Sequence, residues 1–194
     1  MQIRGIIFDL DNTLVLSKLN FEQIRHDIRC PKGADILDFI STLPARERSV
    51  AEQKVREHEL DDAQHATWLP GAKRYVDLLA KANIPMAIVT RNYSAAADVK
   101  MQRNRIPIPL LLTREDAPAK PNPTALLQIA KHWRIDHPEI MYIGDYKYDV
   151  DAANNAGMLS CLYCPGALPS YSGDADIVIS HFDELILKQR LTSQ

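Results

Sequence analysis

The feature that most constrains the fold of this chain is an alternation of short apolar segments with longer segments of helical periodicity. Five apolar runs are predicted strands, at residues 3–8, 85–89, 109–112, 140–143 and 159–163, and residues 176–179 are a plausible short sixth. These runs are almost continuously apolar, which is typical of strands buried on both faces of a sheet. The alternation predicts an α/β fold, with helices covering both faces of a parallel sheet.

Residues 16–69 break this alternation, because they contain only helical patterns. We interpret them as a helical cap inserted into an α/β core that consists of residues 1–15 and 70–194. Charged positions within residues 57–62 are expected to face solvent as i,i+4 pairs. A basic cluster in the cap is likewise interpreted as a solvent-facing surface and left out of the site: Arg25, His26, Arg29 and Lys32.

The overall charge limits the classes of partner. Apolar residues make up 46% of the chain, charged residues 25%, and the net charge is -2. A nucleic acid polymer or an anionic membrane would call for a clustered basic excess, so we expect neither and favour a small-molecule partner. The N-terminus suits neither a signal peptide nor a membrane span, which predicts a cytoplasmic protein. The oligomeric state stays open.

Two aspartates directly follow the first predicted strand. Asp9 and Asp11 are separated by Leu10, so both can point towards one ligand, one as a nucleophile and the other as a general acid or base. Attack of a carboxylate on phosphorus gives an acyl phosphate, which water then hydrolyses. The alternative is an aspartate-rich turn that closes the strand.

Two further strand ends carry groups suited to an anion. Thr90 and Arg91 follow the second strand, where a hydroxyl and the amides of a helix N-terminus can donate to phosphate oxygens, although Thr90 could equally be a plain N-cap. Lys120 lies between the third strand and the next helix, and its ammonium could neutralise both nucleophile and phosphate. Pro121 and Pro123 fix the start of that helix, which favours a rigidly placed lysine over a solvated one.

Two more acids follow the fourth strand. Asp145 and Asp149 suit an oxygen-ligand site for Mg²⁺, and N-capping of the following helix is the simpler alternative. In open α/β sheets, ligands bind at the carboxyl ends of the strands. We therefore expect four carboxylates to converge there with Lys120 and Thr90, and a divalent cation would relieve their repulsion.

These motifs, in this order, resemble the haloacid dehalogenase-like superfamily, and the helical insertion resembles its phosphoglycolate phosphatase-type branch. The motifs are Asp-x-Asp-x-Thr from Asp9, a strand ending in Thr90, Lys120-Pro121, and an acidic motif that spans residues 144–157. The resemblance covers residues 3–8 and 70–187. It implies a Rossmann-like sheet of strand order 5-4-1-2-3, with a cap that is short for this branch.

The resemblance also implies roles for individual residues. Asp9 becomes the nucleophile and a Mg²⁺ ligand, and Asp11 the general acid and base, with its backbone carbonyl on the metal. Thr90, Lys120 and the amides of Leu10, Asp11 and Arg91 would bind phosphate. Asp145 would bind the metal directly, whereas Asp149 would bind it directly or through water, or orient other groups.

The implied activity is magnesium-dependent hydrolysis of a small phosphate monoester through a phosphoaspartate. Dehalogenases of the superfamily lack the second aspartate, so Asp11 argues against that reaction. A sugar-phosphate mutase stays open, although mutases usually carry Gly-Val where this chain has Asn12 and Thr13. A non-catalytic binding or regulatory protein is the other alternative, but such members typically lose the acids that are present here.

Overall fold

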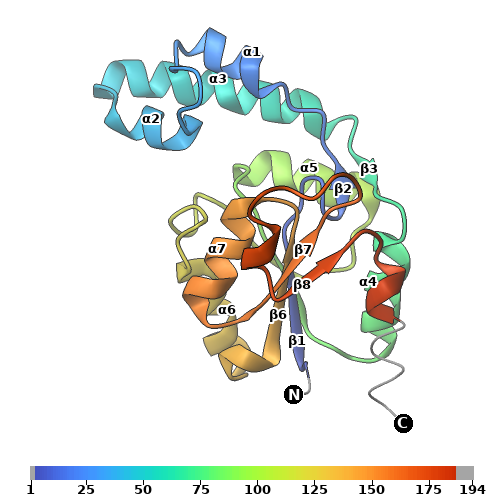
Figure 1. Ribbon diagram of the computed structural model, residues 1–194. Helices are drawn as coiled ribbons and strands as arrows, with labels where there is room; N and C mark the ends of the chain where they lie inside the picture. Colours follow the sequence, from blue (N-terminus) through green and yellow to red (C-terminus); the bar gives the residue numbers. More distant parts are fainter. Residues whose placement is uncertain (1–2, 187–194) are drawn as a thin grey trace.

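The computed structural model describes residues 3–186, which form a six-stranded parallel sheet surrounded by helices (Figure 1). The strands lie side by side in the order β5 (Leu110–Leu112), β4 (Met86–Val89), β1 (Gly5–Phe8), β6 (Ile140–Gly144), β7 (Leu159–Tyr163) and β8 (Ile177–Ile179). The strand order implied by the family resemblance is therefore present, and the short sixth strand extends the sheet beyond β7.

Helices cover both faces of the sheet because the strand side chains alternate. Ile6 and Phe8 of β1 pack into one apolar cluster with α4 (Ala72–Lys81) and α5 (Ser94–Asn104). Ile7 packs into the opposite cluster, to which α6 (Thr124–Trp133) and α7 (Lys147–Ala156) contribute. Figure 1 shows α6 and α7 on one side of the sheet and α4 on the other. Two 3₁₀-helices complete the core, η1 (His137–Glu139) and η2 (Ser172–Asp174).

Three helices lie beyond the carboxyl ends of the strands (Figure 1). They are α1 (Phe21–Asp27), α2 (Ile36–Thr42) and α3 (Ala45–Ala63), and they pack on one another through an apolar cluster of their own. Two short strands join them to the sheet, and Val15–Leu16 (β2) pairs antiparallel with Thr67–Trp68 (β3). We call α1–α3 the cap and the segments around β2 and β3 the cap linkers.

The structure differs from the sequence prediction at several boundaries. The prediction of only helical structure in residues 16–69 is wrong at both ends, because β2 and β3 pair there. Strands β4 and β5 begin one residue later than predicted, after prolines that have no N–H to donate to a neighbouring strand. Residues 1–2 and 187–194 of the predicted core lie outside the described residues. Within residues 3–186, no helix is both long and apolar enough to cross a membrane.

Candidate active site

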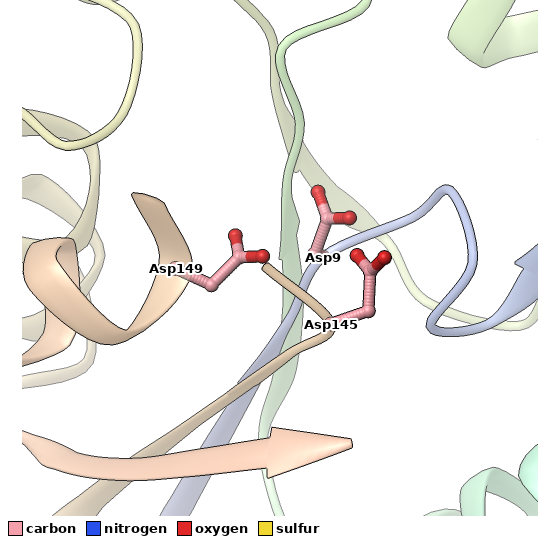
Figure 2. Close-up of side chains that lie close together, drawn as sticks. All are labelled: Asp9, Asp145 and Asp149. Atoms are coloured by element: carbon pink, nitrogen blue, oxygen red, sulfur yellow. The ribbon is translucent and has the colours of Figure 1, made fainter. Parts of the chain in front are cut away.

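Three carboxylates lie together at the carboxyl ends of β1 and β6 (Figure 2). Asp9 directly follows β1, Asp145 directly follows β6, and Asp149 lies in the first turn of α7. Each offers one oxygen, and these oxygens all lie within 4.8 Å of one another. The sheet explains this arrangement, because β1 and β6 are adjacent parallel strands and therefore end at the same edge.

Lys120 places a buried positive charge among these acids. Its Nζ donates to Oδ1 of Asp9 at 2.5 Å, to Oδ1 of Asp149 at 2.6 Å and to the Tyr142 hydroxyl at 2.8 Å. The lysine is only 4% exposed, so solvent screens these contacts weakly. The structure thus places Lys120 within the carboxylate group, in direct contact with Asp9 and Asp149.

Asp149 is held by protein donors on both of its oxygens. Besides the Lys120 contact, Oδ1 accepts from the Tyr142 hydroxyl at 3.0 Å and Oδ2 accepts from the Tyr146 amide at 3.0 Å, which also caps α7. Gly144 makes this approach possible, since a Cβ there would lie 2.2 Å from Cγ of Asp149. Because both of its oxygens already accept hydrogen bonds, Asp149 is better suited to orienting the site than to binding a metal ion directly. Its bond to the Tyr146 amide agrees in part with the alternative prediction that this acid caps the following helix.

The electrostatics of the group leave negative charge uncompensated. The pKa of Asp9 is raised to about 7 and that of Asp145 to about 8: burial is the largest cause, the charge of Asp149 acts in the same direction, and Lys120 acts in the opposite direction. For Lys120 itself burial lowers the pKa, but the attraction of Asp149 and Asp9 raises it overall. One lysine therefore does not balance three carboxylates.

The donor set fits a hard divalent cation. Carboxylate and carbonyl oxygens are the ligands that Mg²⁺ prefers, and Mg²⁺ usually takes one or two carboxylates and keeps several waters. Asp9 and Asp145 supply two such carboxylates at the open edge of the sheet. A cation between them would compensate the negative charge that burial and the neighbouring carboxylates disfavour.

The carboxylate of Asp11 lies in a different network, so the structure brings together three of the four expected carboxylates. Its Oδ1 accepts from Nζ of Lys100 at 2.5 Å, and its Oδ2 accepts from Nδ2 of Asn92 at 2.7 Å. Asp11 still lines the same cavity as Asp9. It can therefore face a bound substrate while Lys100 and Asn92 set its orientation.

The last turns of α3 contribute to this second network. Glu59 and Asp62 were expected to face solvent, but they are only 6% and 8% exposed, and that expectation is wrong. Asp62 pairs with Lys100 at 2.9 Å, and Glu59 pairs with Arg114 at 2.6 Å. The end of α3 reaches the core, so these acids meet cations of the core, the buried Lys100 and the partly buried Arg114, rather than water.

The predicted phosphate-binding groups surround Asp9. Thr90 is buried, and its Oγ1 accepts from the amide of Asn92 at 3.2 Å and from its Nδ2 at 3.0 Å, which leaves its hydroxyl proton free to donate. Among residues 3–186, no acceptor receives the amides of Leu10, Asp11 or Arg91. These amides are therefore available to an anion at the end of the sheet.

The Arg91 side chain serves a purpose that the sequence did not predict. Its Nη2 donates to both carboxylate oxygens of Asp35 at 2.8 and 2.7 Å, and its guanidinium lies 4.5 Å from the centre of the Tyr148 ring. Asp35 is the N-cap residue of α2. Arg91 thus joins the core to the cap, and its charge is largely offset by Asp35.

A cavity of about 340 Å³ lies between the cap and the carboxyl edge of the sheet. The core side of its wall is polar and includes Asp9, Asp11, Thr90, Lys120 and Asp145, whereas the cap side is mostly apolar: Leu19, Phe21, Ile24, Ile36, Leu37 and Val55. The reacting groups and the expected cation would therefore lie at one end of the cavity, and the remainder of a substrate would lie against the cap.

Arg25 is the member of the basic cap cluster that departs from our interpretation. It lines the cavity, whereas His26, Arg29 and Lys32 are exposed as expected. Its Nε donates to the carbonyl of Ala34 at 3.2 Å and its Nη1 to that of Phe21 at 3.3 Å. These bonds hold the side chain along the cap instead of in solvent.

Sequence reasoning missed three residues that the structure places in these networks: Asn92, Lys100 and Tyr142. Lys100 had a usable signal, because it follows Ala96 and Ala97 at helical spacing on an otherwise small, apolar face of α5. Tyr142 lies inside a strand that we interpreted only as core. Its side chain is buried in the core, yet its hydroxyl reaches Lys120 and Asp149.

The chain combines a parallel α/β sheet, an inserted helical cap and an acidic site at the carboxyl ends of the strands. Comparison with protein families gives the class to which this combination belongs. The chain belongs to the haloacid dehalogenase-like hydrolases, whose sequence profile matches residues 18–163.

Individual relatives agree with this assignment. A haloacid dehalogenase-like hydrolase domain-containing protein of Arabidopsis thaliana is 30% identical, with 83% of this chain and 71% of that protein covered. The N-acetylmuramic acid 6-phosphate phosphatase of Pseudomonas aeruginosa is 25% identical over 96% of this chain and 94% of its own length. A hydrolase of Pseudomonas syringae has a similar fold, with a TM-score of 0.80, 20% identity and coverage of 96% and 98% of the two chains.

Proposed function

We propose that this protein is a magnesium-dependent phosphatase that hydrolyses a small phosphate monoester through a phosphoaspartate at Asp9. The observation that carries the proposal is the position of Asp9. It is buried at the polar end of the cavity, 2.5 Å from Lys120, and one of its oxygens lies within 4.8 Å of oxygens of Asp145 and Asp149. The similarity to a phosphatase of Pseudomonas aeruginosa adds support.

In the first step, a carboxylate oxygen of Asp9 attacks phosphorus and the bond from phosphorus to the ester oxygen breaks. Asp11 gives a proton to that leaving oxygen, which avoids the release of an unstable alkoxide. Lys120, Thr90 and the free amides hold the phosphate oxygens and offset the charge that gathers on them.

In the second step, water attacks the phosphorus of the phosphoaspartate and Asp11 takes a proton from that water. The bond between phosphorus and the Asp9 oxygen then breaks, which releases inorganic phosphate and restores the carboxylate. Mg²⁺ held by Asp9, Asp145 and the Asp11 carbonyl, with Asp149 orienting the site, would supply the positive charge that lets an anionic phosphate approach a carboxylate.

The cavity favours a compact substrate. Ligand sites commonly occupy about 300 to 1,000 Å³, and this cavity is near the lower limit at about 340 Å³. Its cap wall is mostly apolar, the charge of Arg91 is offset by Asp35, and Arg25 is held by the carbonyls of Ala34 and Phe21. A second phosphate group would find few free cations there, so hydrolysis of a monophosphate is favoured over a mutase reaction on a sugar bisphosphate.

The proposal is tested by incubating the purified protein with a panel of cellular phosphate esters and measuring inorganic phosphate. We expect release in the presence of MgCl₂ and none in excess EDTA, with Asp9→Asn as the inactive control. Isomerisation of a sugar phosphate without phosphate release would favour a mutase instead. Binding without any turnover across the panel would favour a regulatory protein.

A further inference from the structure

Lys100 is a charged side chain in an entirely buried position of the core. It lies on α5, has an exposed fraction of 0%, and does not line the cavity that holds Asp9. Its Nζ lies 2.5 Å from Oδ1 of Asp11 and 2.9 Å from Oδ2 of Asp62. A buried charge is stable only when it is paired. Of the two partners of Lys100, Asp11 lines the cavity and Asp62 lies in the cap next to a linker.

Asp62 connects Lys100 to both cap linkers. It lies in the last turn of α3, shortly before β3. Its carboxylate also accepts from the Ser17 hydroxyl at 2.9 Å and from the Lys18 amide at 2.6 Å, just after β2. Asp62 therefore connects the end of α3, which leads into the β3 linker, to the linker that follows β2. Lys100 in turn connects Asp62 to Asp11.

The other oxygen of Asp11 is held by Asn92, which belongs to the core loop after β4. The Asp11 carboxylate thus has two anchors, and Lys100 is the one that leads to the cap linkers. Given the acid and base role of Asp11 in the function proposed above, we propose that Lys100 is a positioning residue that fixes the Asp11 carboxylate relative to the linkers of the cap.

Positioning of this kind has a measurable consequence. Proton transfer needs Asp11 within hydrogen-bond reach of the leaving oxygen, and a misplacement of about 1 Å can cost roughly 10²-fold in rate. The cost depends on the leaving group, because an aryl oxide leaves readily without a proton and an alkoxide does not. A lysine that only stabilises the fold would affect both substrates equally.

The test compares wild type, Lys100→Met, Asp62→Asn and the double variant on an alkyl phosphate and an aryl phosphate. The readout is kcat/KM, which reports transfer to the enzyme in a double-displacement reaction. We expect Lys100→Met to lose roughly 10- to 100-fold on the alkyl ester and less than about 3-fold on the aryl ester. Arg103→Met, at an exposed position of the same helix, serves as the matched control.

Asp62→Asn keeps Lys100 and should show a smaller loss with the same preference for the alkyl ester. In the Lys100→Met background it should cause no further selective loss, since the link is already broken. Equal losses on both esters, or a Lys100→Met protein that matches Arg103→Met, would overturn the role of Lys100. If wild type itself releases no phosphate, the proposed function fails first, and the role of Lys100 fails with it.

Discussion

The pKa of Asp9 is raised to about 7, mainly by burial, so ionisation of this carboxyl lowers the free energy of unfolding. Asp9→Asn keeps the shape but removes both the charge and the nucleophile. We expect turnover to fall more than about 10³-fold and the melting temperature of the metal-free protein to rise at pH 8. Phosphate release and thermal unfolding measure the two effects.

Asp98→Asn is the matched control for this change, because Asp98 is an exposed acid on α5. Asp98→Asn should change neither the rate of phosphate release nor the melting temperature. Phosphate release by Asp9→Asn at a rate near that of wild type would remove Asp9 from the mechanism.

At the residue scale, sequence predicted which side chains lie near the site better than it predicted their directions. Asp9 and Asp145 each directly follow a strand, so strand adjacency alone brings them together. Asp11 lies two residues further along a turn, where its direction depends on Lys100 and Asn92, which come from distant positions. Such contacts follow from packing, and packing has no short-range signal in the sequence.

At the scale of elements, the β6–α7 junction holds Asp149 against the end of the strand. A Cβ at position 144 would lie 2.2 Å from Cγ of Asp149, so Gly144→Ala must displace either the strand end or the first turn of α7. We expect a loss of roughly 10²-fold in kcat/KM and weaker Mg²⁺ binding, measured by steady-state kinetics and calorimetry.

Gly173→Ala provides the comparison, because nothing lies within 4 Å of a Cβ built at that position. It should leave both quantities unchanged. Normal activity and Mg²⁺ affinity in Gly144→Ala would show that the site tolerates a displaced Asp149.

In the cap, the sequence predicted the helices but not which of their charged residues are buried. Helical periodicity in residues 16–69 was enough to predict the cap helices, and α3 contains the charged positions of residues 57–62. The same charges predicted a solvent-facing helix, yet Asp62 and Glu59 are buried against Lys100 and Arg114. Local sequence does not say which part of a polar helix will meet buried cations of another element.

For the whole molecule, the acidic site links stability to both pH and Mg²⁺. The pKa values of Asp9 and Asp145 are raised from 3.8 to about 7 and about 8, so folding favours their protonated forms. Their contribution to stability is therefore full below pH 3.8 and is lost as pH rises through 7 to 8. The metal-free protein should lose this contribution progressively between pH 3.8 and about 8, and little further loss is expected above that pH.

Mg²⁺ binds the ionised carboxylates, so its stabilising effect should increase over the same range. Saturation at about 100 times the dissociation constant adds about 2.7 kcal/mol to the free energy of unfolding. We expect the Mg²⁺-induced rise in melting temperature to be larger at pH 8.5 than at pH 6, and to be strongly reduced in Asp145→Asn. A rise that is independent of pH, or equal in Asp145→Asn, would place the ion elsewhere.

The architecture of the whole molecule was the part most accessible to prediction. Alternating apolar strands and helices leave few arrangements for a parallel sheet, and the family resemblance supplied the strand order that the structure shows. The cavity was not accessible in this way. Its apolar cap wall and its volume depend on how α1 and α2 lie over the sheet edge, which no periodicity encodes.

The central claim is that phosphate passes through Asp9 with Asp11 as the acid and base, and the phosphoenzyme itself tests it most directly. Asp11→Asn should still transfer phosphate from an aryl phosphate to Asp9, because that leaving group needs little protonation. Hydrolysis of the intermediate would then lack its base, which normally contributes roughly 10²- to 10⁴-fold. Rapid quench and mass spectrometry should find added phosphate on the peptide that contains Asp9. Absence of that phosphate, with equal loss of rate on alkyl and aryl esters, would contradict the mechanism.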